Sequence, residues 1–290
     1  MRVKQRIVIC GGSGVVGGAL SQRLRESGYD VAIVSRHPES GEFSWEQLPS
    51  VLEGALAVVN LAGSPIARKF TDANKKEILD SRVNSTLQVG AAIEQCSHGP
   101  TKWINASATG YYGDRGDEVL TEESKPGTGF VADVCSAWES ACLQSSAKTS
   151  KRILRLGIVL SKQGGALVPL IKVTKLFLGG RVGSGMQWMP WLTISDLTRL
   201  IQYSIENEMP EIVNACAPNP VQNRQFMAWL RAQIGRPWSP PVPAAMLTIV
   251  GKLVGPDASL LLGSSRVISE KTGGFQFDFP SLENLKLGDI

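Results

Sequence analysis

The amino-acid sequence lacks the features that mark several large classes of protein. Its five cysteines are odd in number and show no metal-binding spacing, so the sequence predicts neither a disulfide framework nor a metal site. The longest apolar stretch, 242–254, contains proline, glycine and lysine and is too short to cross a bilayer. The 30 basic and 26 acidic residues leave a net charge of +4, too small and too scattered to indicate a nucleic-acid-binding face. We therefore expect no nucleic-acid partner and no membrane partner.

The start of the chain leaves little space before the first apolar segment, which begins at Ile7. No signal or transit peptide fits there, so we expect a cytoplasmic protein with reduced, mostly buried thiols. A chain of 290 residues can bury a large core and suits one α/β unit with a smaller second lobe.

The stretch 6–17, RIVICGGSGVVG, organises the rest of the sequence. A short, mostly β-branched run predicts a strand buried on both faces of a parallel sheet, followed by a glycine turn and a helix. Free backbone N–H groups and the positive end of the helix dipole would meet there, which is an arrangement that binds a pyrophosphate. The alternative is a tight strand-to-helix turn that binds no ligand. The cofactor-binding candidates are Gly11, Gly12, Ser13, Gly14, Val15, Val16 and Gly17.

The end of the second predicted strand, 29–34, indicates which dinucleotide is bound. An acidic residue at this point accepts from the ribose 2′-hydroxyl of NAD, whereas a basic residue suits the 2′-phosphate of NADP. The sequence has no carboxylate there and offers Ser35 as a hydroxyl donor and Arg36 as a planar fork for phosphate. We therefore predict NADP, against the alternative of a solvated arginine in a loop.

The third predicted strand, 55–61, ends in small residues that let the backbone pass close to a cofactor. Leu61, Ala62 and Gly63 are the candidates at this point. A long helix is predicted over 71–93, with Glu77 and Arg82 on a polar flank whose simplest interpretation is a solvated face.

Hydroxyl groups follow the next predicted strand, 101–106. Ser107 comes directly after it, and Tyr111 and Tyr112 lie in the segment that follows. The carboxyl ends of central parallel strands border the crevice where ligands bind, so these three residues are the catalytic candidates. A helix is predicted over 130–145, in which Trp138 is expected to pack in the core.

The remaining segments suggest two lobes. We predict a sixth strand over 152–160, a loop-rich segment over 161–191, and further helix, strand and helix over 193–207, 211–216 and 223–235. The expected fold is a Rossmann-type doubly wound parallel sheet with a smaller, discontinuous substrate lobe. The NADP-binding domain would comprise 1–160, with 194–216 returning to it, and the substrate lobe and C-terminal appendage would comprise 161–193 and 217–290.

An ordered set of segments resembles the extended short-chain dehydrogenase/reductase superfamily, the NAD(P)-dependent epimerase/dehydratase group. Within it, the chain is similar to an atypical subfamily of epimerase-like proteins with a small C-terminal domain of unknown function. The matching segments are GGSGVVG (11–17), SRHP (35–38), VVNLAGSPI (58–66), SATGYYGDRG (107–116), GFVADVCSAWE (129–139), RLGIVLSKQGGAL (155–167), GSGMQWMPWLTISDL (183–197), VNACAPNP (213–220) and SSRVISEKTGGFQFDFP (264–280).

The resemblance implies NADP contacts at the glycine turn, at Ser35 and Arg36, and at Leu61 and Ala62. It also implies that Glu77, Arg82 and Val159 line the cofactor site.

The chain departs from the superfamily where proton transfer is expected. Ordinary members use a tyrosine whose pKa is lowered by a lysine four residues later. The corresponding positions here are Phe130 and Val134, and only the hydroxyl position survives, at Ser107. Ser64 stands where the subfamily pattern has glutamate.

Three functional hypotheses follow. The first is an NADP-dependent oxidoreductase or epimerase-like enzyme with altered acid–base residues, in which Ser107 is an oxyanion-side donor and Tyr111 or Tyr112 an alternative phenol. Asp114 and Asp133 are weaker candidates. The second is a non-catalytic NADP(H)-binding module with a regulatory or redox-sensing role. The third, an ordinary sugar-nucleotide epimerase, is disfavoured by the missing tyrosine and lysine. The sequence names neither the small-molecule substrate nor the oligomeric state.

Overall fold

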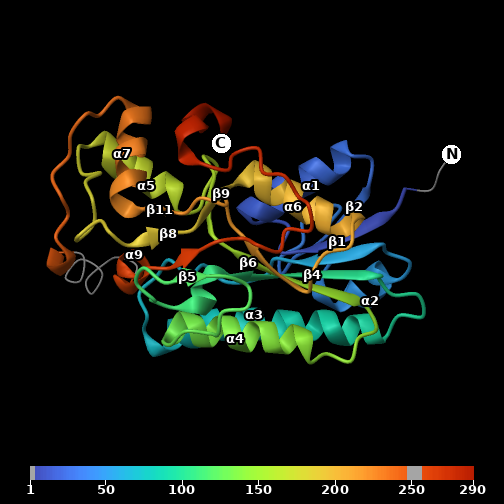
Figure 1. Ribbon diagram of the computed structural model, residues 1–290. Coiled ribbons are helices and arrows are strands. Elements are labelled where there is room, and N and C mark those ends of the chain that lie inside the picture. The colour runs from blue at the N-terminus through green and yellow to red at the C-terminus, as the bar shows by residue number, and fades with distance from the viewer. Residues whose placement is uncertain (1–3, 247–256) are drawn as a thin grey trace.

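A six-stranded, fully parallel sheet forms the centre of the computed structural model, which describes residues 4–246 and 257–290. The strand order across the sheet is β10-β6-β4-β3-β1-β2 (Figure 1). The predicted parallel sheet is thereby confirmed. Its strands are β1 (Arg6–Cys10), β2 (Asp30–Val34), β3 (Ala57–Asn60), β4 (Lys102–Ala108), β6 (Ser150–Leu156) and β10 (Ile212–Ala215).

Helices cover both faces of this sheet, as expected for a doubly wound fold. On one face lie α1 (Val15–Glu26) and α6 (Ile194–Glu206), and on the other lie α2 (Leu48–Leu52), α3 (Asp72–Glu94) and α4 (Phe130–Leu143) (Figure 1). Alternate residues of β1 serve the two cores: Ile7 and Ile9 pack in the cluster with α1, whereas Val8 and Cys10 pack in the opposite cluster. The apolar run at the start of the chain is therefore explained by burial on both sides.

The sheet has a topological switch point between β1 and β3. The chain pairs β1 with β2 on one side and then crosses to place β3 on the other side of β1. Beyond β2, an isolated parallel bridge joins Val34 to Phe43. In open α/β sheets, ligands bind at the carboxyl ends of the strands at such a switch point, which here lies above Cys10 and Asn60.

A second lobe packs at the carboxyl-end side of the sheet around its own hydrophobic cluster (Figure 1). The cluster includes Leu167 of α5 (Leu167–Lys175) and Phe226 of α7 (Asn223–Ile234), together with Leu285 near the C-terminus. The lobe thus draws on both segments predicted for it. The exact domain boundaries stay a prediction.

The predicted strand over 152–160 is wrong as a single element. At Gly157 the chain leaves the central sheet, and β7 (Ile158–Leu160) pairs instead with β9 (Trp191–Thr193). A Cβ atom at Gly157 would lie 2.9 Å from the carbonyl oxygen of Pro190, so the backbones of residues 157 and 190 are in close contact just before β7 and β9 pair. The segment 161–191 also contains α5, which its many glycines concealed.

The other described elements are short. They are η1 (Trp45–Gln47), η2 (Thr109–Tyr112), β5 (Val119–Leu120), β8 (Trp188–Met189), β11 (Val221–Gln222), α9 (Ser259–Leu262), β12 (Arg266–Val267), η3 (Leu282–Asn284) and η4 (Leu287–Asp289). All five cysteines lie within the described residues and are free thiols, four of them buried, as predicted. Across the described ranges, none of the helices combines the length and hydropathy that a membrane crossing requires.

Candidate functional site

In the glycine turn after β1, the fold requires glycine at three positions but not at Gly14. Gly11 has a φ of +84°, and Cβ atoms added at Gly12 and Gly17 would lie 2.5 Å from Ile33 Cγ2 and the Gly11 carbonyl oxygen. At Gly14 the nearest atom to an added Cβ is the Gly11 carbonyl oxygen, at 3.5 Å. The space beside Gly14 is therefore open for a ligand rather than filled by the chain.

The same turn leaves the N-terminus of α1 available to an anion. Gly14 is the N-cap residue, and in this described part of the chain no side chain caps the helix and its first turn has no acidic residue. The unpaired N–H groups and the helix dipole therefore favour negative charge at this point. Ser13, Val15 and Val16 belong to this turn and to the first helical residues, so the geometry fits the predicted pyrophosphate site.

Ser35 and Arg36 lie beside the turn because β1 and β2 are neighbours. The Gly11 amide donates to the Val34 carbonyl oxygen at 3.1 Å, which ties the turn to the end of β2. Ser35 is buried, and its hydroxyl accepts from the His37 amide at 3.3 Å. Arg36 is exposed and takes part in no ion pair within the described chain. Its guanidinium is therefore available to a phosphate.

The segment after β3 closes the other side of the turn. The Leu61 amide donates to the Cys10 carbonyl oxygen at 2.9 Å, and the Ala62 amide donates to Asn60 Oδ1 at 3.2 Å. An added Cβ at Gly11 would lie 2.9 Å from the Ala62 nitrogen. Residues 61–63 therefore form a wall beside the glycine turn, and their predicted contact with a cofactor stays a prediction.

A cavity of about 260 Å³ lies at the carboxyl ends of β4 and β6, beside the first turn of α1. It brings together six of the predicted site residues: Val16, Leu61, Gly63, Arg82, Ser107 and Val159. Sequence reasoning had not assigned the others to a ligand site: Ile66, Ala106, Ala108, Val131, Val134, Cys135, Trp138, Leu156 and Gly157. The walls are mostly apolar. The i, i+3, i+4 and i+7 spacing of Val131, Val134, Cys135 and Trp138 on α4 is the signal that could have found one wall.

Ser107 is the second-last residue of β4, and its hydroxyl is hydrogen-bonded to Glu139. The Ser107 Oγ donates to Glu139 Oε1 at 2.6 Å, and both residues are buried. Arg155 binds the same carboxylate through two hydrogen bonds, Nε to Oε1 at 2.9 Å and Nη2 to Oε2 at 2.8 Å. Because the Ser107 proton points to the carboxylate, its hydroxyl can face the cavity only as an acceptor. This differs from the donor role expected from the sequence.

Arg155 keeps its charge in this buried setting. Burial opposes the charge, but the hydrogen bonds and Coulomb attraction of Glu139 outweigh it and raise the pKa of the Arg155 guanidinium. Removal of either partner would leave an uncompensated buried charge, which is expensive. The pair therefore fixes the Ser107 hydroxyl rigidly.

Tyr111 and Tyr112 are not among the described residues that line the cavity. Tyr112 is fully buried; its hydroxyl accepts from Arg155 Nη1 at 2.9 Å and donates to Asn214 Oδ1 at 2.7 Å. Burial raises the pKa of the Tyr112 phenol to about 12. The Tyr111 ring centroid lies 3.5 Å from Arg155 Cζ. Both rings thus hold Arg155 in place, and this geometry favours a supporting role for them.

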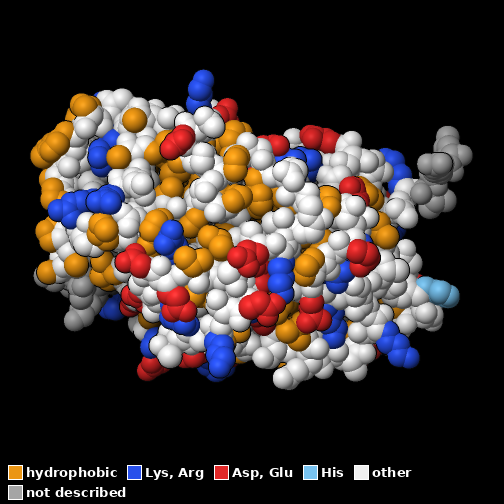
Figure 2. Space-filling view, viewed as in Figure 1, with side chains coloured by type: hydrophobic (Ala, Val, Ile, Leu, Met, Phe, Trp, Pro, Cys, Tyr) orange, Lys and Arg blue, Asp and Glu red, His pale blue; other side chains and the backbone are white. Residues whose placement is uncertain are grey.

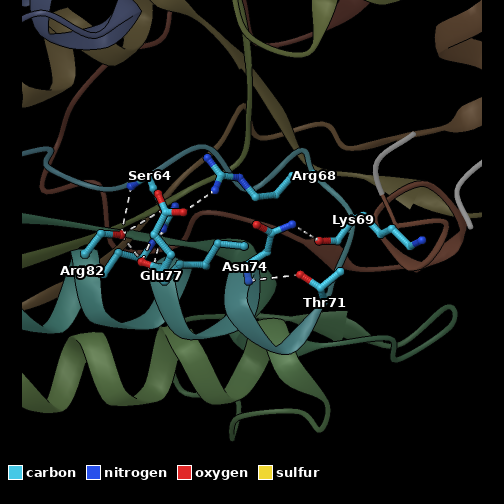
Figure 3. A network of polar contacts seen from close by, with 9 residues as sticks. Ser64, Arg68, Lys69, Thr71, Asn74, Glu77 and Arg82 are labelled. Carbon is cyan, nitrogen blue, oxygen red and sulfur yellow. Dashed lines mark hydrogen bonds and ion pairs between the residues drawn. The ribbon is translucent and has the colours of Figure 1, made fainter. Parts of the chain in front are cut away.

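Glu77 and Arg82 occupy neighbouring turns of α3 but have different surroundings (Figure 3). Glu77 Oε2 is paired with Arg68 Nη1 at 2.6 Å, and half of the Glu77 side chain is exposed. Arg82 lines the cavity, where its guanidinium lies 5.2 Å from the Trp138 ring centroid and donates to the Ile78 carbonyl oxygen at 3.0 Å. Burial lowers the pKa of Arg82. The structure therefore brings Arg82 into the cavity and leaves Glu77 outside its lining.

Ser64 fills the position next to this pair without replacing the missing glutamate. Its amide donates to Ser81 Oγ at 3.0 Å, and its side chain is buried against α3 (Figure 3). Across the described residues, Arg82 has no ion pair with a carboxylate. Arg82 is thus a cation on the cavity wall that is open to a ligand.

The helix positions of the usual tyrosine and lysine offer no acid–base group. The Phe130 ring packs edge-on against Phe70, with centroids 4.8 Å apart, and Val134 lines the cavity. The neighbouring thiol of Cys135 also lines it, and burial raises the pKa of Cys135 to about 12, so this thiol stays protonated near neutral pH. The polar groups that the cavity presents are therefore Ser107, Arg82 and a neutral thiol.

Comparison with known proteins identifies the family of the chain. The chain belongs to the NAD dependent epimerase/dehydratase family, which it matches over residues 7–216. It is 34% identical to the mouse Epimerase family protein SDR39U1 over 96% of this chain and 97% of that protein.

Two solved structures extend the comparison. The human epimerase family protein SDR39U1, crystallised with NADPH, is 32% identical with a TM-score of 0.90, over 97% of this chain and 100% of that chain. A nucleoside-diphosphate sugar epimerase from Corynebacterium glutamicum is 32% identical with a TM-score of 0.78, over 97% of this chain and 57% of that one.

Proposed function

We propose that the chain binds NADP(H) across the glycine turn, with the nicotinamide end of the dinucleotide in the cavity beside Ser107. The open space at Gly14 and the uncapped start of α1 suit the pyrophosphate. Arg36, free of ion pairs among the described residues, suits the 2′-phosphate. The human relative with a TM-score of 0.90 was crystallised with NADPH, which supports this choice of cofactor. Leu61, Ala62 and Val159 would border the bound dinucleotide.

We further propose that the chain is an oxidoreductase whose proton path differs from the usual one. NADP(H), when bound, supplies or takes up a hydride. The observation that carries the proposal is the 2.6 Å hydrogen bond from Ser107 Oγ to Glu139 Oε1. A substrate hydroxyl that donates to Ser107 Oγ can pass its proton there while the Ser107 proton moves to Glu139. In the direction of reduction both protons move the opposite way.

The cavity limits what the substrate can be. Ser107 offers an acceptor to a hydroxyl or amine, and Arg82 offers a cation to a carbonyl, carboxylate or phosphate. The remaining walls are mostly apolar. These features favour a small molecule with one hydroxyl next to an anionic or carbonyl group.

The second candidate function is a non-catalytic NADP(H)-binding module. Phe130 and Val134 at the usual acid–base positions favour it. A crystal structure with NADPH separates the two candidates. Room for a substrate between the nicotinamide C4 atom and Ser107 supports the enzyme, and a nicotinamide ring that fills the cavity completely supports the module.

A further inference from the structure

Two long stretches of the second lobe lack acidic residues. The sequence has no aspartate or glutamate between Glu139 and Asp196, and none between Glu211 and Asp257. These two acid-free stretches include α5 and α7 and the segments around them. Their cations in the described part of the lobe are Lys162, Lys172, Lys175, Arg181, Arg224, Arg231 and Arg236. The net charge of +4 for the whole chain conceals this uneven distribution.

The same lobe exposes large apolar side chains next to these cations. The α5 patch comprises Val173 (38% exposed), Leu176 (70%), Phe177 (47%), Leu178 (55%) and Trp238 (66%). Figure 2 shows hydrophobic side chains gathered over the α5–α7 lobe, with Lys and Arg side chains among them. Single exposed apolar residues are ordinary, but a contiguous patch marks an interaction surface.

Backbone pairing makes the α5 patch contiguous. Val182 and Val242 form a parallel bridge, so the segments before them, which carry Leu178 and Trp238, run side by side. Arg236 joins the two segments: its Nε donates to the Lys175 carbonyl oxygen at 3.2 Å, and its Cζ lies 4.6 Å from the Phe177 ring centroid.

The turn after α5 leaves Phe177 partly exposed and places its backbone in an unfavourable conformation. Phe177 has a φ of 61° and is the one non-glycine residue with positive φ in the described ranges. A bulky side chain is disfavoured in this conformation, which glycine or asparagine would adopt more easily.

We propose that the α5 patch is a docking surface for a membrane leaflet rich in anionic phospholipid. Interfacial membrane sites combine Trp, Phe and Leu with flanking lysines and arginines, as here, and they need no spanning helix. Lys172, Lys175 and Arg181 flank the patch and have no ion pair in the described chain. The expectation of no membrane partner rested on the missing span, which does not exclude such peripheral contact.

Other occupants fit the patch less well. In a dimer through this face, the cations Lys172, Lys175 and Arg181 of two copies would be brought together and repel each other. For a nucleic acid, the exposed residues Leu176 and Leu178 offer no aromatic face for base stacking, and the Phe177 ring is already stacked with Arg236. None of the described lining residues of the cavity belongs to the patch, so the proposal is independent of the cofactor site.

Vesicle sedimentation of the full chain tests the proposal. We expect the protein to pellet with vesicles of phosphatidylcholine mixed with phosphatidylglycerol, to stay in solution with phosphatidylcholine alone, and to be released as salt is raised. Equal recovery with both kinds of vesicle overturns the charge argument. A concentration-dependent dimer in sedimentation velocity that Leu176→Gln dissociates assigns the patch to a second copy instead. Release from the vesicles by single-stranded RNA, together with binding of that RNA by the same patch, assigns it to nucleic acid.

Matched variants locate the surface. Leu176→Gln combined with Trp238→Gln should abolish pelleting, whereas Leu87→Gln, at a residue 52% exposed on α3, should have no effect. Lys172→Gln combined with Lys175→Gln should lower the vesicle partition coefficient about tenfold or more, and Lys125→Gln should not. Thermal melts confirm that each variant is folded. If the Lys172 and Lys175 double variant, which alters only exposed side chains, binds like the wild type, the proposal is wrong.

Discussion

The Ser107 hydroxyl lies 2.6 Å from Oε1 of Glu139 and, since that carboxylate is also paired with Arg155, donates its proton to it. Ser107 is thereby oriented with its lone pairs toward the cavity. In the proposed reaction, this serine and its buried carboxylate replace the tyrosine–lysine couple, whose positions are occupied by Phe130 and Val134. The following predictions test that arrangement and the cofactor site around it.

Ser107→Ala should lower the rate of NADPH oxidation with reactive carbonyl compounds roughly 10²-fold, because general acid–base assistance is typically worth roughly 10²–10⁴-fold. NADPH affinity should change little. Tyr111→Phe and Tyr112→Phe serve as controls that keep the rings around Arg155. If Ser107→Ala keeps the full rate while one of the tyrosine variants loses it, the phenol and not the serine transfers the proton.

Glu139→Leu should reduce the free energy of unfolding by about 3–5 kcal/mol, because it leaves the Arg155 guanidinium buried without its partner. Glu118→Leu is the matched control, since its ion pair with Arg115 is partly exposed to solvent and should contribute at most about 1 kcal/mol. Urea unfolding of the three proteins measures both changes. Similar losses in the two variants would contradict the assigned importance of the buried pair.

Gly14→Val should abolish NADPH binding while the protein stays folded. An added Cβ at Gly14 meets the chain only at ordinary van der Waals distance, but it occupies the space assigned to the pyrophosphate. Gly17→Val is the contrasting variant and should destabilise the fold itself, because its Cβ would lie 2.5 Å from the Gly11 carbonyl oxygen. Thermal melts with and without NADPH make the comparison. An undiminished stabilisation of Gly14→Val by NADPH would place the phosphates elsewhere.

Alkylation of Cys135 should be slow near neutral pH and should accelerate as pH rises. Burial raises the pKa of this thiol to about 12, so at about pH 8 its thiolate fraction is roughly a thousandfold below that of a free thiol. The rate should keep rising about tenfold per pH unit beyond the pH at which a small thiol has levelled off. Iodoacetamide labelling followed by mass spectrometry of the Cys135 peptide measures this. A rate that levels off near pH 9 would show that the thiol is not buried as described.

The central sheet could be predicted from the sequence because its strands are buried on both faces and read as apolar runs, as Ile7–Cys10 does. The glycine turn was readable for a similar reason, since Gly11, Gly12 and Gly17 are required by local close approach. The break at Gly157 could not be predicted, because it depends on close packing against Pro190, which is distant in the sequence. The helix α5 could not be predicted either, because the glycines of the neighbouring turns made the whole segment resemble a loop.

The candidate site was predictable where function depends on backbone position and not where it depends on side-chain partners. Leu61 and Ser107 follow from strand ends that the sequence marks, whereas Val159 was implied by the family resemblance. The Glu139–Arg155 pair joins α4 to β6, and no spacing in the sequence signals that contact. The direction of the Ser107 hydrogen bond, which decides its chemical role, therefore emerges only from the three-dimensional structure.

Calorimetric titration of the wild type and Arg36→Ala with NADPH and NADH tests most directly the claim that this is an NADP(H) site. A bidentate contact between a guanidinium and a phosphate is worth about 1.5–3 kcal/mol, so NADPH should bind the wild type about tenfold more tightly than NADH, or better. Arg36→Ala should remove most of that preference and leave the affinity for NADH almost unchanged. Equal affinities for the two dinucleotides in the wild type, or no binding of either, would contradict the account.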